Sequence, residues 1–390
     1  MNGPSCVYLD YAATTPVEPL VAERMAQCLG RDGVFGNPGS TSHVYGEAAS
    51  ERVEAARAEV AATVGAEPAE IIWTSGATEA NNLAIFGVAQ YNAQVGRHIV
   101  TVRTEHKAVL DPCRELERRG WRVTYLTPDR SGVLDPAAVA AALRPDTVLV
   151  SVMHVNNEIG VIQDIAAIAA LCARSGSARL HVDAAQSIGK CAVNFSELGI
   201  DLLSLSAHKA YGPKGVGALV VSRARGVQLK PLQYGGGQER ALRSGTVATH
   251  QVVGMGVAFA LVKAAPRDET LRIALLRDRL WDGLRSIGGV LRNGDSERSV
   301  PHLLNVSFEG VEGESLVAAV RPHIAVSTGS ACTSINQEPS YVLRALGRDD
   351  RLAESSLRFS FGRFSTAADV DTAVSAVRRA VERLRRIGGA

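Results

Sequence analysis

The sequence has no long hydrophobic run. No segment offers the roughly 18 uninterrupted apolar residues that a membrane-spanning helix needs. Residues 1–10 also lack the basic stretch and the apolar core of a secretory signal. We therefore expect a cytoplasmic protein with no membrane partner.

Cysteine is scarce and scattered. The six cysteines include no C-x-x-C pair and no grouping with histidine at the spacing of zinc ligands, which argues against a disulfide scaffold and against a metal site. Five of them lie among apolar or helical neighbours and are expected to be buried; these are Cys6, Cys28, Cys113, Cys172 and Cys191. Cys332 differs, because residues 327–334 around it are small or polar and predict an accessible loop.

Neither sign of charge is in excess. The chain has 42 Lys and Arg residues against 40 Asp and Glu residues, so we expect no direct nucleic-acid partner. Arginines gather near the C-terminus at helical spacing, where a solvated helix face is the ordinary interpretation and an acidic protein partner is the alternative. These are Arg378, Arg379, Arg383, Arg385 and Arg386.

The middle of the chain alternates helical and strand patterns. Helix-like segments such as residues 51–64 are followed by short apolar runs, a pattern that predicts the α/β class with a mainly parallel sheet flanked by helices. The runs are residues 71–74, 98–102, 147–152, 180–183, 202–205 and 217–221. We assign residues 16–265 to a large domain of this kind.

A smaller α+β domain is predicted from residues 1–15 and 266–390. Pro266, after an apolar helix at residues 251–264, marks a plausible hinge. The last helix is well signalled, since Ser365 or Thr366 can cap it with Asp369 completing a capping box. One apolar stripe follows, formed by Val370, Val374, Val377, Val381 and Leu384.

The strongest chemical feature is Lys209, which follows a predicted strand and precedes a glycine-rich turn. A buried amine at the end of a strand can form a Schiff base with an aldehyde, whereas a surface lysine is the plain alternative. Asp183 ends another strand, and a carboxylate there can pair with a pyridinium nitrogen. A solvated aspartate is the alternative for Asp183. With Gln186 near a ring hydroxyl, the set favours pyridoxal phosphate.

A phosphate site is available at residues 73–82, where WTSGATEANN gives a strand, a turn and a helix start. Backbone N–H groups at a helix N-terminus bind phosphate, although an ordinary N-cap explains Ser75 equally well. Neither G-x-G-x-x-G nor G-x-x-x-x-G-K-[ST] occurs there, so the dinucleotide and P-loop signatures are missing.

Together with residues 183–186 and 204–215, these motifs resemble fold-type I pyridoxal-phosphate enzymes, and more narrowly the cysteine desulfurases of the class V aminotransferase group. The resemblance runs almost end to end. The other matching strings are YLDYAATTP at 8–16, GNPGS at 36–40, TEHKAV at 104–109, VNNEIG at 155–160, GGGQER at 235–240, RSGT at 243–246, GSACTS at 329–334 and RFSFGR at 358–363.

The resemblance implies a role for individual residues. His106 would stack on the cofactor ring and assist proton transfer, and Asn157 and Gln186 would approach the ring hydroxyl. Arg358 would hold the substrate carboxylate, with Asn37 also placed at the substrate. The phosphate would be held by Ala77, Thr78, Ser206 and His208, joined by Thr246 from the other subunit of a homodimer. Without the resemblance, a satisfied polar histidine and a salt bridge would explain His106 and Arg358.

The implied activity is cysteine desulfuration. L-cysteine displaces Lys209, the freed amine moves the α-proton, and the Cys332 thiolate takes the sulfur as a persulfide while alanine leaves. An acceptor protein then receives the sulfur, for iron–sulfur assembly or for thiolation of tRNA, cofactor or DNA, and the sequence does not choose among these. An aminotransferase or selenocysteine lyase on the same cofactor, and a sulfur-carrier or adaptor without turnover, remain the alternatives.

Overall fold

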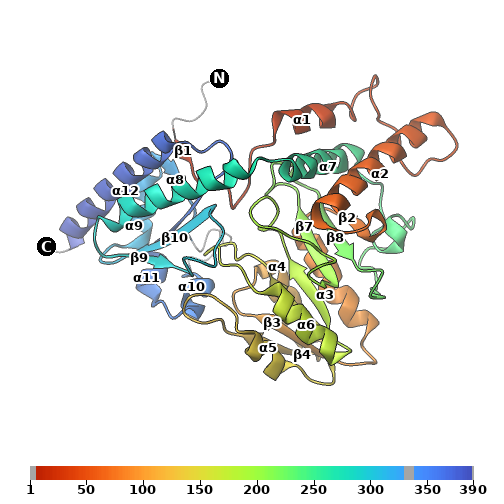
Figure 1. The fold of residues 1–390 in the computed structure, drawn as a ribbon, viewed down its shortest axis with the longest axis horizontal. Coiled ribbons are helices and arrows are strands. Elements are labelled where there is room, and N and C mark those ends of the chain that lie inside the picture. Colours follow the sequence, from red (N-terminus) through yellow and green to blue (C-terminus); the bar gives the residue numbers. More distant parts are fainter. Residues whose placement is uncertain (1–5, 329–337, 389–390) are drawn as a thin grey trace.

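A seven-stranded sheet forms the centre of the larger part of the molecule (Figure 1). The computed structural model describes residues 6–328 and 338–388. The strand order is β2-β8-β7-β6-β5-β3-β4, in which β8 is antiparallel to both neighbours and the four other pairs are parallel. The strands are β2 (Ile71–Thr74), β3 (His98–Val102), β4 (Arg122–Leu126), β5 (Thr147–Met153), β6 (Arg179–Asp183), β7 (Leu202–Ser206) and β8 (Gly217–Val221). The predicted α/β class is confirmed.

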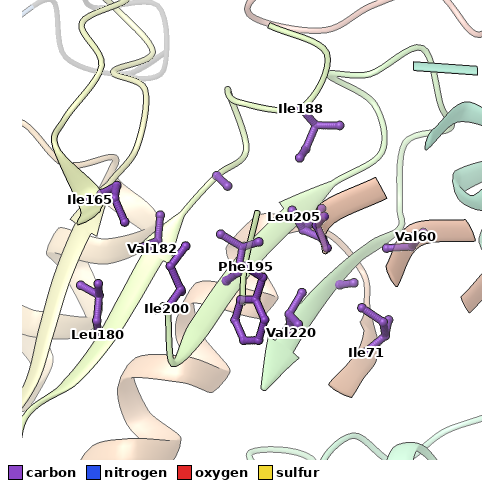
Figure 2. Close-up of a cluster of buried hydrophobic side chains, with 14 of the residues drawn as sticks. Val60, Ile71, Ile165, Leu180, Val182, Ile188, Phe195, Ile200, Leu205 and Val220 are labelled. Carbon is purple, nitrogen blue, oxygen red and sulfur yellow. The ribbon is translucent and has the colours of Figure 1, made fainter. Parts of the chain in front are cut away.

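Helices cover both faces of this sheet. Successive strand residues point to opposite faces, so Val100 and Val150 pack with one group of helices while Ile99 and Leu149 pack with the other. Figure 2 shows part of the first cluster, where Phe195 lies beside Val182 and Leu205. The helices of this part are α1 (Pro19–Ala26), α2 (Val44–Val64), α3 (Ala77–Tyr91), α4 (Lys107–Arg118), α5 (Pro136–Ala142), α6 (Ile165–Ser175) and α7 (Thr249–Lys263).

A three-stranded antiparallel sheet, in the order β12-β10-β9, lies in the other part of the molecule. Its helices include α8 and α12, which pack side by side, and Leu9 near the chain start joins the same apolar cluster. A two-stranded parallel pair, β1 with β11, links the N-terminus to this part. The elements are β1 (Val7–Tyr8), α8 (Arg267–Arg285), β9 (Val290–Asn293), β10 (Leu303–Phe308), α9 (Gly313–Val320), β11 (Ile324–Ala325), α10 (Tyr341–Ala345), α11 (Asp350–Glu354), β12 (Ser356–Ser360) and α12 (Ala367–Gly388).

Two elements differ from the sequence-based expectation. Strand β4 was not predicted, because it lies at the sheet edge and is only partly buried, so it carries no continuous apolar run. Helix α2 begins at Val44, before the expected residue 51, because the His43 ring caps it by accepting from the Gly46 N–H at 3.1 Å.

The capping box of the last helix is confirmed by reciprocal hydrogen bonds between Thr366 and Asp369. The domain boundaries at 15/16 and 265/266 stay predictions.

A buried ion pair holds a strained turn against the sheet edge. Glu239, Arg240 and Ala241 form a 3-10 turn in which all three have positive φ, of 46°, 58° and 62°. Such angles are costly for residues other than glycine. The Arg57 guanidinium binds both oxygens of Glu239 at 2.9 Å, and Glu239 also accepts the Trp73 N–H of β2 at 2.8 Å. The pair therefore fixes the turn to the strand that leads into α3.

Replacing Glu239 with alanine should lower the free energy of unfolding by about 3–5 kcal/mol, because it leaves the Arg57 charge buried without that partner. The matched control is Glu54→Ala. Glu54 binds the same arginine but its side chain is 59% exposed, against 4% for Glu239, so its loss should cost about 1 kcal/mol or less. Denaturant unfolding measures both variants, and equal losses would contradict this account.

Candidate active site

One cavity of about 580 Å³ collects most of the predicted site residues. The carboxyl ends of parallel strands meet at one edge of a sheet, and β5, β6 and β7 end there. Arg358 reaches the cavity from β12 of the other sheet. The predicted residues that line it are Ala77, Thr78, His106, Asn157, Asp183, Gln186, Ser206, His208, Lys209 and Arg358.

Asp183, the last residue of β6, is a rigidly held carboxylate. It is 5% exposed, and its two oxygens accept from Asn81 Nδ2 at 2.7 Å and from the Ala185 N–H at 2.9 Å. Both donors are neutral, so they orient the carboxylate without cancelling its charge. Sequence analysis missed Asn81 as a site residue. Its position one helical turn after Thr78, on the same face of α3, is the signal that could have identified it.

The N-terminus of α3 offers an anion site. Its N-cap is Gly76, whose φ of 150° suits only glycine and which has no side chain to cap the helix. The backbone of β8 lies close behind, since a Cβ added to Gly217 would come within 2.7 Å of Gly76 Cα. Backbone N–H groups at such a start attract anions. Ser206 and His208 line the same cavity as this helix start.

His106 enters the cavity as a neutral ring. It caps α4, and its Nδ1 accepts from the Ala108 N–H at 3.1 Å, which leaves the ring proton on Nε2. Burial and the nearby Lys209 lower the pKa of His106. Burial also lowers the pKa of His208 to about 4. The His208 ring is therefore uncharged near neutral pH.

Arg358 is already engaged within the protein. Its guanidinium donates to Asp10 Oδ1 and to the Asn157 carbonyl oxygen, both at 2.8 Å, while Nε has no hydrogen-bond partner among the described residues. Asp10, which sequence analysis did not select, also accepts from Ser327 Oγ at 2.9 Å. The arginine thus lines the cavity with its charge balanced by Asp10.

Three predicted residues are not brought to this cavity. Asn37 is exposed between α1 and α2, where its side chain accepts from the Gly39 N–H at 2.9 Å. Thr246 is exposed before α7, and its predicted role was in the site of the other subunit. Cys332 lies outside the described residues, after Ser327, which lines the cavity. The roles of these three stay predictions.

Glu158 is a buried carboxyl beside the site. It is 4% exposed, and it accepts a hydrogen bond of 2.5 Å from the hydroxyl of Ser340, the N-cap of α10. Burial raises the pKa of Glu158 to about 7, although Ser340 and Arg358 act in the opposite direction. The folded protein therefore holds a proton on Glu158 more tightly than the unfolded chain does.

This predicts a specific pH dependence for Glu158→Gln. Stability from a raised carboxyl pKa is present below the unfolded value of 4.5 and is lost as pH rises through about 7. The unfolding free energy of the wild type, minus that of the variant, should fall by roughly 2–3 kcal/mol between pH 5 and pH 8. Denaturant unfolding at both pH values tests it, with the exposed Glu59→Gln as control. A difference that does not change with pH would refute the assignment.

The amino-acid sequence is similar to known proteins along nearly its whole length. Residues 7–373 match the family described as aminotransferase class-V. The chain belongs to this family. It is 58% identical over 381 residues to the cysteine desulfurase IscS of Aeromonas hydrophila subsp. hydrophila. The matched region covers 98% of this chain and 94% of that protein. The expectation of a cysteine desulfurase of this family is confirmed by such full-length homologues.

Solved structures agree in fold. A NifS-like protein superposes with a TM-score of 0.91 at 35% identity, over 97% of this chain and 100% of that one. The structure of SspA in complex with cysteine matches with a TM-score of 0.81 at 38% identity, over 92% of this chain and 99% of that one. Within residues 6–328 and 338–388, no helix is long and apolar enough to cross a membrane, and no cluster of three or more His, Cys, Asp or Glu side chains is arranged to hold a metal.

Proposed function

We propose that this protein uses pyridoxal phosphate, the cofactor of its family, to take sulfur from L-cysteine, leaving L-alanine and a persulfide on Cys332. The observation that carries the proposal is the cavity, where an amine, a fixed carboxylate and a helix N-terminus face one another in a full-length homologue of cysteine desulfurases. Lys209, Asp183 and Ala77 mark these three points.

The residues of the cavity fit this cofactor. Asp183, held by Asn81, would pair with the ring nitrogen, and the start of α3 with Ser206 and His208 would hold the phosphate. A buried acceptor also lacks a partner among the described residues, since Asn157 Oδ1 makes no hydrogen bond there. A cavity of about 580 Å³ lies within the usual range for cofactor sites.

When bound, pyridoxal phosphate withdraws electrons from the α-carbon of an attached amino acid. Lys209 then takes the α-proton, a task for which an amine needs a pKa near the working pH. His106 lines the cavity with its proton on Nε2 and can share in the proton transfer. Arg358, which lines the cavity, would hold the substrate carboxylate.

The sulfur step belongs to Cys332. Its thiolate would attack the substrate sulfur, and a sulfur–sulfur bond forms as the carbon–sulfur bond breaks. The carbon fragment takes up one proton at the β-carbon and recovers the α-proton from Lys209, and then leaves as alanine. Burial keeps the pKa of Cys113 and of Cys172 at about 12, so these two thiols are not nucleophiles near neutral pH.

A second subunit and an acceptor protein complete the proposal. Thr246 and the 78% exposed Tyr234 lie on one loop, tied together by a bridge between Gln233 and Arg243. An exposed aromatic beside a predicted phosphate ligand suits a homodimer interface. The persulfide would pass to an acceptor that serves iron–sulfur assembly or thiolation of tRNA, cofactor or DNA. Capture of the protein that receives labelled sulfur from Cys332 would identify it.

Cys332→Ser should reduce alanine formation from L-cysteine by at least about 100-fold, because it removes the nucleophile. Cofactor binding should persist. The control is Cys6→Ser, at a partly buried cysteine outside the cavity, which should keep wild-type turnover. Unchanged alanine formation by Cys332→Ser would overturn the mechanism in favour of one that does not need this thiol, as in a selenocysteine lyase, whereas an aminotransferase would form no alanine from L-cysteine at all.

Lys209→Ala should abolish the visible absorption of the purified holoenzyme and its turnover, because the covalent attachment point of the cofactor is lost. Lys263→Ala, at an exposed lysine at the end of α7, should retain both. A wild-type protein with no such absorption and no alanine release would instead support the adaptor function.

A further inference from the structure

Lys190 is an amine outside the cofactor cavity that contacts one of its walls. Its Nζ donates a hydrogen bond to Gln186 Oε1, and the Nε2 of Gln186 donates to the Ala12 carbonyl oxygen at 2.7 Å. Gln186 lines the cofactor cavity, whereas Lys190 lines a second cavity of about 660 Å³. Lys209 lines both cavities, so the two lysines share the second one, and Lys190 reaches the cofactor cavity only through Gln186.

We propose that Lys190 is a positioning residue that fixes the orientation of the Gln186 side-chain amide, so that an N–H donor and not an oxygen faces the bound cofactor. The inference rests on the proposed function, because it concerns cofactor binding in that cavity.

The two contacts of Gln186 decide the orientation by their chemistry. A backbone carbonyl can only accept, so the end of the amide at Ala12 must be the NH₂ group, and an amine donor at the other end requires the oxygen there. Nε2 carries two N–H groups, and Ala12 uses one. The second N–H is available to a ligand in the cavity that Gln186 lines.

The hydrogen bond to Gln186 is the main polar contact of the Lys190 amine. The cations that act on it are Lys209 and Arg358, the Cys191 thiol also lies nearby, and no carboxylate forms an ion pair with it among the residues that the structure describes. Burial and the two cations lower the pKa of Lys190 to about 7. Since the amine is partly uncharged near neutral pH, it can remain inside the protein without a counterion.

The test measures cofactor affinity directly. Apoprotein is titrated with pyridoxal phosphate and the dissociation constant is read from absorption, for the wild type and for Lys190→Met, which keeps the length of the side chain and removes the donor. We expect binding to weaken about threefold to tenfold, the usual worth of one buried hydrogen bond. Lys263→Met, at a lysine that lines the same second cavity, should bind as the wild type does.

A double-mutant cycle with Gln186→Leu distinguishes positioning from a general structural effect. If Lys190 acts through the amide, adding Lys190→Met to Gln186→Leu should change the dissociation constant by less than about twofold. Full additivity of the two losses, or a Lys190→Met apoprotein that binds the cofactor as tightly as the wild type, would overturn the proposal. A wild-type protein that does not bind the cofactor would instead refute the proposed function, so the two failures are distinguishable.

Discussion

The site depends on one constraint, the parallel pairing of β5, β6 and β7. Parallel strands bring their carboxyl ends to the same edge, where Asp183 ends β6, Asn157 follows β5 and Lys209 follows β7. The fully buried strands are fixed in register by apolar side chains on both faces, because a slip of one residue would exchange those faces. Packing of the sheet therefore sets the spacing of the chemical groups.

Polar contacts between residues far apart in the sequence also position the side chains that line the cavity. Asp10 and Arg358 are 348 residues apart and belong to segments that meet only when the N-terminal strand pairs with the smaller part of the molecule. Asn81 and Asp183 are 102 residues apart and connect α3 to the sheet. Each pair joins a group that faces the cavity to an element anchored elsewhere, so loosening either element would misplace the group.

The sequence predicted the strands and the site to different degrees. The six apolar runs are strands, because full burial imposes continuous hydrophobicity, whereas the half-exposed β4 left no such pattern. Lys209 and Asp183 could be selected from the sequence because chemistry limits which side chains can serve a pyridine ring and its aldehyde, and the structure places both at one cavity. The residues that support the side chains of the site could not be selected from the sequence. Asn81, Asp10 and Lys190 are ordinary polar residues in the sequence, and their importance appears only when the packing supplies their partners.

The ion pair between Arg358 and Asp10 has a consequence for ligand recognition. A buried guanidinium without a counterion would make the protein depend on its ligand for stability, and Asp10 removes that dependence. The same carboxylate is then a tethered internal competitor for any carboxylate that enters the cavity. If Arg358 binds the substrate carboxylate as proposed, its apparent affinity for that group would be reduced by the fraction of time that Asp10 holds the arginine, which would favour rapid release over tight retention.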